Sequence, residues 1–389
     1  MSLVNIISAI GNNKSVYPLL VRDCGIEVPT KVVLTYNQNL KDSKEMAKNA
    51  TRERLIDEYT TSAVWLGGIP LLNRIADWAI KKFGFAPSVN AELYKERKNQ
   101  GIKYNIEKFK DVAPKEVAEL KKALAQKKTY QRMLAGKFLF TTAIPIALMG
   151  YIIPKLNFKL TEILRKKKEE KQRKNNNVSF KGVTSAMANM STVNKMAITD
   201  GGYAVGRVAT GRNKYEKMEM TFKMSGMMFL NFAAPIMIAK GMDELSGKLF
   251  KTNVNLDPKV LQQGVELSNM ELPEGNFIDY LDKNPNSRFS KLCEEYCGVK
   301  YLKNRVRDPR AYVDEKKVEA FKKELKKFIT EAMKEGNVEK YSKRALRVKT
   351  FNILVNIIIS SLLLAVALPK ATFYLRKLVT GSDAEPGLL

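Results

Sequence analysis

Hydrophobic residues are concentrated in a few uninterrupted runs along the chain. The longest run, FNILVNIIISSLLLAVAL, covers residues 351–368 and has no formal charge between Lys349 and Lys370. As an α-helix, this run measures roughly 27 Å, which is close to the hydrocarbon thickness of a bilayer. A helix also satisfies its own backbone hydrogen bonds in lipid. The run therefore predicts a transmembrane helix, with a buried core helix of a soluble protein as the alternative.

Two shorter uncharged runs cover residues 138–153 and 224–239. Each would form a helix of roughly 24 Å, which is marginal for a complete crossing and also suits a helix that enters one leaflet and returns. A fourth run at residues 62–72, SAVWLGGIPLL, is shorter still and is followed by Arg74 and Asp77. This run predicts an interfacial or re-entrant helix, or a fourth crossing. The alternative is a soluble helix kinked at Gly67, Gly68 and Pro70.

A proline lies in or directly after every apolar run, preceded by a pair of small or aliphatic residues. The shared pattern permits a weak internal repeat of helical hairpins. The prolines that define it are Pro70, Pro145, Pro235 and Pro369.

The Lys and Arg residues around the runs leave two topologies open. If residues 62–80 cross the bilayer, both chain ends lie on the same side as residues 155–223, and the basic regions 81–137 and 241–350 lie on the other side. In the second topology, the proline-containing runs enter one leaflet and return. The chain is expected to be an integral membrane protein, with most of its basic segments on the cytoplasmic side.

Amphipathic helices are predicted between the apolar runs. In residues 314–335 the apolar side chains recur at helical spacing, the other face carries Lys and Glu, and Gly336 ends the pattern. The β-branched stretch VPTKVVLTY, at residues 28–36, predicts the one possible strand. The expected fold class is mainly α: a helical membrane protein with three to four proline-containing apolar helices, spanning or re-entrant, basic amphipathic helices and at most a small N-terminal β element.

Five regions follow from this pattern. The chain is expected to divide into an N-terminal region with a short amphipathic helix and a possible strand, a first membrane-associated region with a polybasic end, a Gly-rich segment with the second apolar run, a soluble helical region, and a C-terminal transmembrane helix with a tail. Their bounds are 1–60, 61–174, 175–240, 241–350 and 351–389. The last residues, GSDAEPGLL, are expected to be disordered.

The charge of the chain implies an anionic partner. It has 67 Lys and Arg residues against 40 Asp and Glu residues, a formal net charge of +27. A polybasic segment just after an apolar run is attracted to an anionic lipid surface, by about 1 kcal/mol for each basic side chain near it. The alternative is a solvated helix end. The predicted lipid-binding residues are Arg165, Lys166, Lys167, Lys168, Lys171, Arg173 and Lys174.

The composition also excludes common catalytic sites. The chain has no histidine, which removes Ser-His-Asp and Cys-His sites and HExxH zinc sites. Cys293 and Cys297 are four residues apart and would share one helix face, where packing is favoured over metal binding because no other thiol or imidazole donor lies nearby. No catalytic, metal-binding or cofactor-binding residue is predicted, and no cofactor is expected.

The segment TDGGYAVGRVATGR, residues 199–212, contains G-x-x-x-x-G-R twice. A phosphate-binding P-loop requires Lys and then Ser or Thr after its second glycine, and this segment lacks both. The remaining interpretations are close helix packing through the Gly202-x-x-x-Gly206 face and a flexible loop.

Three functional hypotheses follow. The first is a membrane protein with a binding, scaffolding or membrane-shaping role at an anionic surface, with anionic lipids as partners and helix association with itself or another membrane protein. The second is a basic nucleic-acid-binding protein, although no RNP signature or zinc finger supports it. The third is a transporter or membrane enzyme, for which the sequence offers no site and the three main apolar runs contain no ionisable residue.

Overall fold

The computed structural model describes residues 21–97, 99–166 and 192–387. Within these residues the chain is mainly helical and contains no β-strand. The helices that form the long bundle are η1 (Val21–Glu27), α3 (Val28–Asn39), α4 (Lys44–Ala63), η2 (Val64–Gly68), α5 (Ile69–Lys82), α8 (Lys127–Ala147), η4 (Leu148–Ile152), α9 (Ile153–Lys166), α10 (Thr192–Ala209), α11 (Lys214–Met228), η6 (Phe229–Ala233), α12 (Ala234–Phe250), α18 (Val338–Leu362), η8 (Leu363–Ala367) and α19 (Leu368–Thr380). The helices outside the bundle are η3 (Ala91–Tyr94), α6 (Ile102–Phe109), α7 (Pro114–Ala125), α13 (Pro258–Leu261), α14 (Gly264–Ser268), α15 (Phe277–Lys283), α16 (Arg288–Leu292), η7 (Cys293–Cys297) and α17 (Glu315–Lys334).

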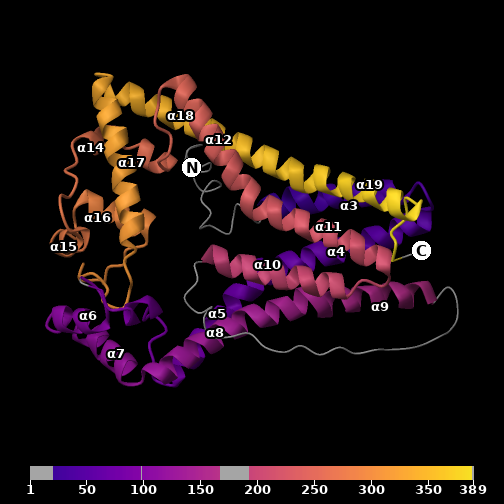
Figure 1. Ribbon diagram of the computed structural model, residues 1–389, viewed down its shortest axis with the longest axis horizontal. Helices are drawn as coiled ribbons and strands as arrows, with labels where there is room; N and C mark the ends of the chain where they lie inside the picture. The colour runs from indigo at the N-terminus through magenta and orange to yellow at the C-terminus, as the bar shows by residue number, and fades with distance from the viewer. Residues whose placement is uncertain (1–20, 98, 167–191, 388–389) are drawn as a thin grey trace.

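Four long helical rods run along the bundle, and each rod consists of two α-helices joined by a π-helical turn (Figure 1). The rods are α4–α5, α8–α9, α11–α12 and α18–α19. Neighbouring rods are antiparallel: Glu53 contacts Asn157, and further along Asp77 contacts Lys137. Helices α3 and α10 pack against these rods: α3 contacts α4 and α19, and α10 contacts α8 and α11.

A proline follows each π-helical turn of the bundle at the second position after the turn ends. The residue before the proline donates its N–H to the carbonyl five residues earlier, as Ile69 does to Val64 and Leu368 does to Leu363. Proline lacks an N–H, and its ring collides with the carbonyl four residues earlier in a regular α-helix. The wider turn accommodates the ring without breaking the helix. The prolines concerned are Pro29, Pro70, Pro154, Pro235 and Pro369.

The structure differs at one position from the proline pattern that the sequence suggested. In the second apolar run the π turn precedes Pro154, whereas Pro145 lies inside α8. It also adds Pro29, which follows η1 and belongs to no predicted run. The local structure therefore repeats around the prolines that follow a π turn.

The predicted N-terminal strand is wrong, because residues 28–36 form most of α3. Pro29 is the second residue after the π turn η1, and the wider turn leaves room for its ring. The buried positions are Val28, Lys31, Thr35 and Asn39, which share one helix face against α4. Three of these four residues are polar, so the apolar residues of this stretch do not recur at helical spacing. Packing against α4 outweighed the β propensity of the valines.

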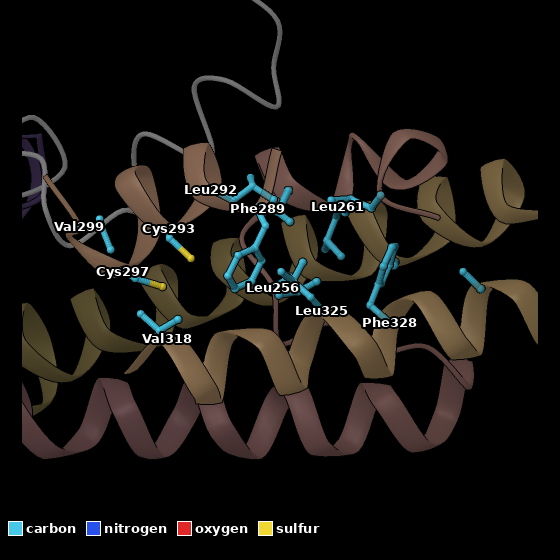
Figure 2. Packing of buried hydrophobic residues seen from close by; sticks show 14 of the residues in the cluster. Leu256, Leu261, Phe289, Leu292, Cys293, Cys297, Val299, Val318, Leu325 and Phe328 are labelled. Carbon is cyan, nitrogen blue, oxygen red and sulfur yellow. The ribbon is translucent and has the colours of Figure 1, made fainter. Parts of the chain in front are cut away.

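Residues 251–337 form a helical module at one end of the bundle (Figure 1). Its core gathers buried apolar side chains from several short helices onto α17, including Phe289, Leu325 and Phe328 (Figure 2). The helix predicted at residues 314–335 is confirmed as α17, which Asp314 caps at its N-terminus. Apolar side chains form the core of the module, and the one ion pair with a fully buried guanidinium among its described residues is Arg307 with Asp282.

A second chain segment completes this module. Residues 83–126, which include α6 and α7, pack on residues 302–313. Asn105 donates a hydrogen bond to the Pro309 carbonyl, and Arg310 pairs with Glu119 at 2.7 Å. The two regions with high basic content in the sequence therefore lie together, at the same end of the bundle.

The expectation of a disordered C-terminus is wrong for residues 381–387. Gln38 donates a hydrogen bond to Asp383 at 2.6 Å, and the Glu385 N–H donates one to the Asn39 side chain at 2.9 Å. Burial raises the pKa of the Glu385 carboxyl, but the guanidinium groups of Arg376, Arg54 and Arg212 outweigh this effect and hold it below its ordinary value. The polar composition that suggested disorder supplies the buried partners of these contacts.

Candidate functional site

The bundle has an inverted distribution of polar and apolar side chains. Three helices are long and apolar enough to cross a membrane: Lys127–Leu164, Lys214–Phe250 and Val338–Thr380. In the most apolar 18-residue segment of each helix, only 28%, 11% and 33% of the segment, respectively, is buried. Large apolar side chains such as Phe229 and Ile358 face outward. Polar side chains such as Thr142, Asn352 and Ser360 lie inside, as do several charged groups.

A cluster of buried ion pairs joins the helices of the bundle. In this buried charge cluster, Arg207 of α10 pairs with Asp57 of α4 at 2.5 Å, and Arg376 of α19 pairs with Glu219 of α11 at 2.7 Å. Arg212 bridges Glu53 and Glu216 at 3.1 and 2.9 Å. Its members are Glu27, Lys31, Glu53, Arg54, Asp57, Glu58, Arg207, Arg212, Glu216, Glu219, Lys223, Arg376 and Glu385.

Glu58 is the centre of this cluster. Its carboxylate contacts Arg54 at 3.2 Å, Lys31 at 3.4 Å and Lys223 at 3.5 Å, which brings three helices together on one side chain. Burying an ion costs several kcal/mol unless partners and hydrogen bonds compensate for the lost water. Among the described residues, however, Asp57 Oδ1 and two nitrogens of Arg207 have no hydrogen-bond partner. The interior of the cluster therefore contains hydrogen-bonding atoms that no described residue pairs with.

A small cavity of about 90 Å³ lies at the edge of the buried charge cluster. The π turns η1, η2, η6 and η8 all contribute side chains to its wall, and π turns interrupt helices frequently at functional sites. Four carboxyl groups and one ammonium group line it, from Asp23, Glu27, Lys31, Glu58 and Asp200. Because carboxylates outnumber cations in its wall, the cavity is suited to a positively charged ligand.

Asp200 differs from the other acidic residues of this wall. Glu27 and Glu58 take part in ion pairs of the cluster, and Asp23 also has an interaction partner. Asp200 forms no ion pair or hydrogen bond with another described residue, although it is half-buried next to Tyr203 in the cavity wall. Its carboxyl group is therefore the acidic group of the wall most available to a ligand.

The glycines of residues 201–206 position α10 beside this cavity. A Cβ atom on Gly206 would lie 2.9 Å from the Gly150 Cα, and one on Gly202 would lie 2.4 Å from Ile146 Cδ1. The packing interpretation of Gly202-x-x-x-Gly206 is thus confirmed. The loop interpretation is wrong for residues 199–209, which belong to α10, whereas Gly211 lies in the turn that follows the helix. A phosphate-binding loop at residues 201–207 is excluded for the same reason.

Of the predicted lipid-binding residues, the structure describes the backbone of two. Arg165 and Lys166 belong to the last turn of α9. The remaining predicted residues, Lys167, Lys168, Lys171, Arg173 and Lys174, lie outside the described residues.

The buried charge cluster was missed from the sequence because it lies beside the apolar runs rather than within them. A usable signal exists in α4, whose buried positions Ala47, Ala50, Glu53 and Asp57 follow the helical period. Two small residues followed by two acidic residues on one face indicate a helix that packs closely and carries charge inward. A search for apolar stripes alone overlooks this face.

Cys293 and Cys297 have the packing role that the sequence predicted. Both are buried in the core of the helical module, on the π-helical turn η7 (Figure 2). A hydrogen bond with Cys297, together with burial, raises the pKa of the Cys293 thiol, which keeps it protonated and unreactive. The described residues contain no group of three or more Cys, Asp or Glu side chains arranged to hold a metal ion.

Comparison of the chain with protein-family models, with curated proteins and with solved structures gave no match. The functional argument therefore rests on the chemistry of these residues.

Proposed function

We propose that this chain is an integral membrane protein that holds a helical module at an anionic membrane surface, where the module binds or scaffolds a partner. The inverted polarity of the bundle supports this proposal most strongly. In water, outward apolar side chains such as Phe229, Ile236 and Phe351 would each lose the free energy that burial provides, about 1.5–3 kcal/mol for a large side chain. Lipid removes this penalty, and contiguous apolar surface of this kind is characteristic of membrane contact.

The directions of the rods support a topology with four crossings. The rods α4–α5, α8–α9, α11–α12 and α18–α19 alternate in direction along the chain, as consecutive crossings must. In contrast, α10 runs parallel to α8–α9, because Ile146 faces Gly202 and Gly150 faces Gly206. Helix α10 therefore cannot be the crossing that directly follows α8–α9. This topology places residues 83–126 and 251–337 together on one side.

Carbonate extraction tests the membrane proposal. In membranes from cells that express the full chain, we expect the protein to stay in the pellet at alkaline pH, because its outward apolar side chains remain in lipid after peripheral proteins are released. Immunoblots of pellet and supernatant give the result. Complete release would contradict the proposal. Release by nuclease and high salt would instead favour the nucleic-acid-binding alternative.

The acidic cavity favours a second candidate function. We also propose that the bundle binds and conducts protons through the cavity beside Asp200 and Glu58. Ionisable residues inside a membrane bundle are costly, and they commonly mark ion pathways. Helices interrupted at corresponding positions also surround the binding sites of many transporters. Four of the π turns in this bundle meet at the cavity.

An Asp200→Asn variant tests this second function. In liposomes that contain a pH-sensitive dye, the unmodified chain is expected to increase proton flux over empty liposomes. The variant is expected to return the flux to that of empty liposomes, because the carboxylate most available to a proton is gone. The matched control is Asp111→Asn, which removes an exposed carboxylate outside the bundle. Equal flux in Asp200→Asn and unmodified protein would contradict the proposal.

A further inference from the structure

Helix α18 carries a face that changes from basic to apolar within one turn. Lys340, Arg344 and Arg347 recur at helical spacing and are followed on the same face by Phe351, Leu354 and Ile358. The side chains of Phe351 and Ile358 are 60% and 57% exposed. In the proposed membrane arrangement, this change corresponds to the boundary between water and lipid. It lies next to the helical module, which begins where α12 ends (Figure 1).

A groove of about 570 Å³ lies at this level. Its wall combines Phe250 from the end of α12 with the basic face of α18, chiefly Lys340, Lys343 and Arg347. Helix α12 is fixed beside α18 because Asp243 pairs with Lys349 at 2.6 Å. The groove therefore lies between two joined helices, and its apolar lining consists of Phe250 and Val348. Phe351 and Leu354 follow outside the groove on the same face of α18.

The groove contains cations that the described residues leave unneutralised. Lys343 pairs with Glu339, and Arg344 pairs with Glu335. Lys340 and Arg347 form no ion pair with any residue that the structure describes. Two unpaired cations beside an exposed apolar strip are complementary to a molecule with an anionic head and an apolar tail.

We propose that this groove binds one anionic phospholipid, with its headgroup phosphate between Lys340 and Arg347 and an acyl chain along Phe351 and Leu354. This inference rests on the proposed membrane function, since it needs the apolar face of α18 to lie in lipid. Arg and Lys pair strongly with phosphate oxygens, and the adjacent apolar strip replaces contact between acyl chains. The apolar strip next to the two cations distinguishes this face from a general basic surface, which would attract any polyanion.

The test uses the full chain, purified in detergent and mixed with equal amounts of phosphatidylglycerol and phosphatidylcholine with identical acyl chains. Native mass spectrometry counts the lipids that remain bound. We expect the unmodified chain to retain phosphatidylglycerol selectively. The double variant K340Q/R347Q is expected to bind it about thirtyfold more weakly, because two basic side chains that attract the anionic headgroup are lost. The matched control is K316Q/K323Q, which removes two exposed charges from α17, away from the groove.

The outcomes separate the possible explanations. Loss of selectivity in K340Q/R347Q alone supports the groove, whereas equal loss in the control shows that only net charge matters and overturns it. Displacement of the lipid by an equal concentration of glycerol phosphate, which has no acyl chain, overturns the lipid as occupant, as does displacement by an oligonucleotide. Carbonate extraction of both double variants is the companion measurement. Retention in the pellet with unselective lipid binding refutes this site while leaving the membrane function intact.

Discussion

Replacing Arg376 with methionine is expected to lower the free energy of unfolding by about 3–5 kcal/mol, because the change leaves buried carboxylates without a partner. The Arg376 side chain has no exposed surface and donates hydrogen bonds to both oxygens of Glu219, at 2.9 and 2.7 Å. It also lies 3.7 Å from Glu385 and donates a hydrogen bond to the Asp383 carbonyl, so it ties the C-terminal residues to the bundle. The measurement is unfolding of the full chain in mixed micelles by titration with SDS.

The neighbouring residue provides a matched control. Lys377 pairs with Asp383 at 3.4 Å, but 62% of its side chain is exposed. Exposed pairs of this kind contribute about 0–1 kcal/mol, so Lys377→Met is expected to change the stability very little. The double variant R376M/E219L removes both charges of the main pair and is expected to recover part of the lost stability. Equal effects of Arg376→Met and Lys377→Met would show that the buried charge cluster does not hold the bundle together.

The sequence predicted the parts of the fold that depend on continuous apolar patterns. The three long apolar runs all lie within helices, and α17 was found from its amphipathic period and its terminal Gly336. Such patterns are local, since each records which side of one helix contacts an apolar environment. The one strand prediction failed because α3 buries polar residues such as Lys31 and Thr35, so its apolar residues gave no helical period.

The candidate site could not be predicted in the same way, because its parts come from distant segments. Glu58 meets Lys31 and Lys223 only after three helices have packed, and Arg376 meets Glu219 across 157 positions of sequence. A charged residue in a polar stretch is usually solvated, so its burial has no local signal. The prolines, in contrast, are a local signal for the π turns, because each π turn of the bundle is followed by one. In the second apolar run, however, only the structure shows that the π turn precedes Pro154 rather than Pro145.

Replacing Gly206 with alanine is expected to destabilise the bundle by about 1–3 kcal/mol, and replacement with leucine by more, because α10 and the π turn η4 are already in backbone contact. An added Cβ would lie 2.9 to 3.0 Å from the Cα, carbonyl carbon and carbonyl oxygen of Gly150. Backbone atoms cannot rotate away as a side chain can, so α10 itself must move. Titration with SDS measures the loss. Proton flux is expected to fall with it, because α10 carries Asp200 and Tyr203 in the cavity wall.

Two nearby glycines make this prediction specific to position. A Cβ on Gly201 would meet only Met228 Cε, at an ordinary 3.7 Å, so Gly201→Ala is expected to be neutral or to stabilise the helix by up to about 1 kcal/mol. Gly202→Ala should lie between the two, because the atoms in its way belong to the Ile146 side chain, which can adopt another rotamer. If all three alanine variants unfolded at the same SDS concentration, close approach of α10 to η4 could not be what positions the cavity. An effect confined to Gly206 and Gly202 would show that the two glycines bring the acidic wall of the cavity into place.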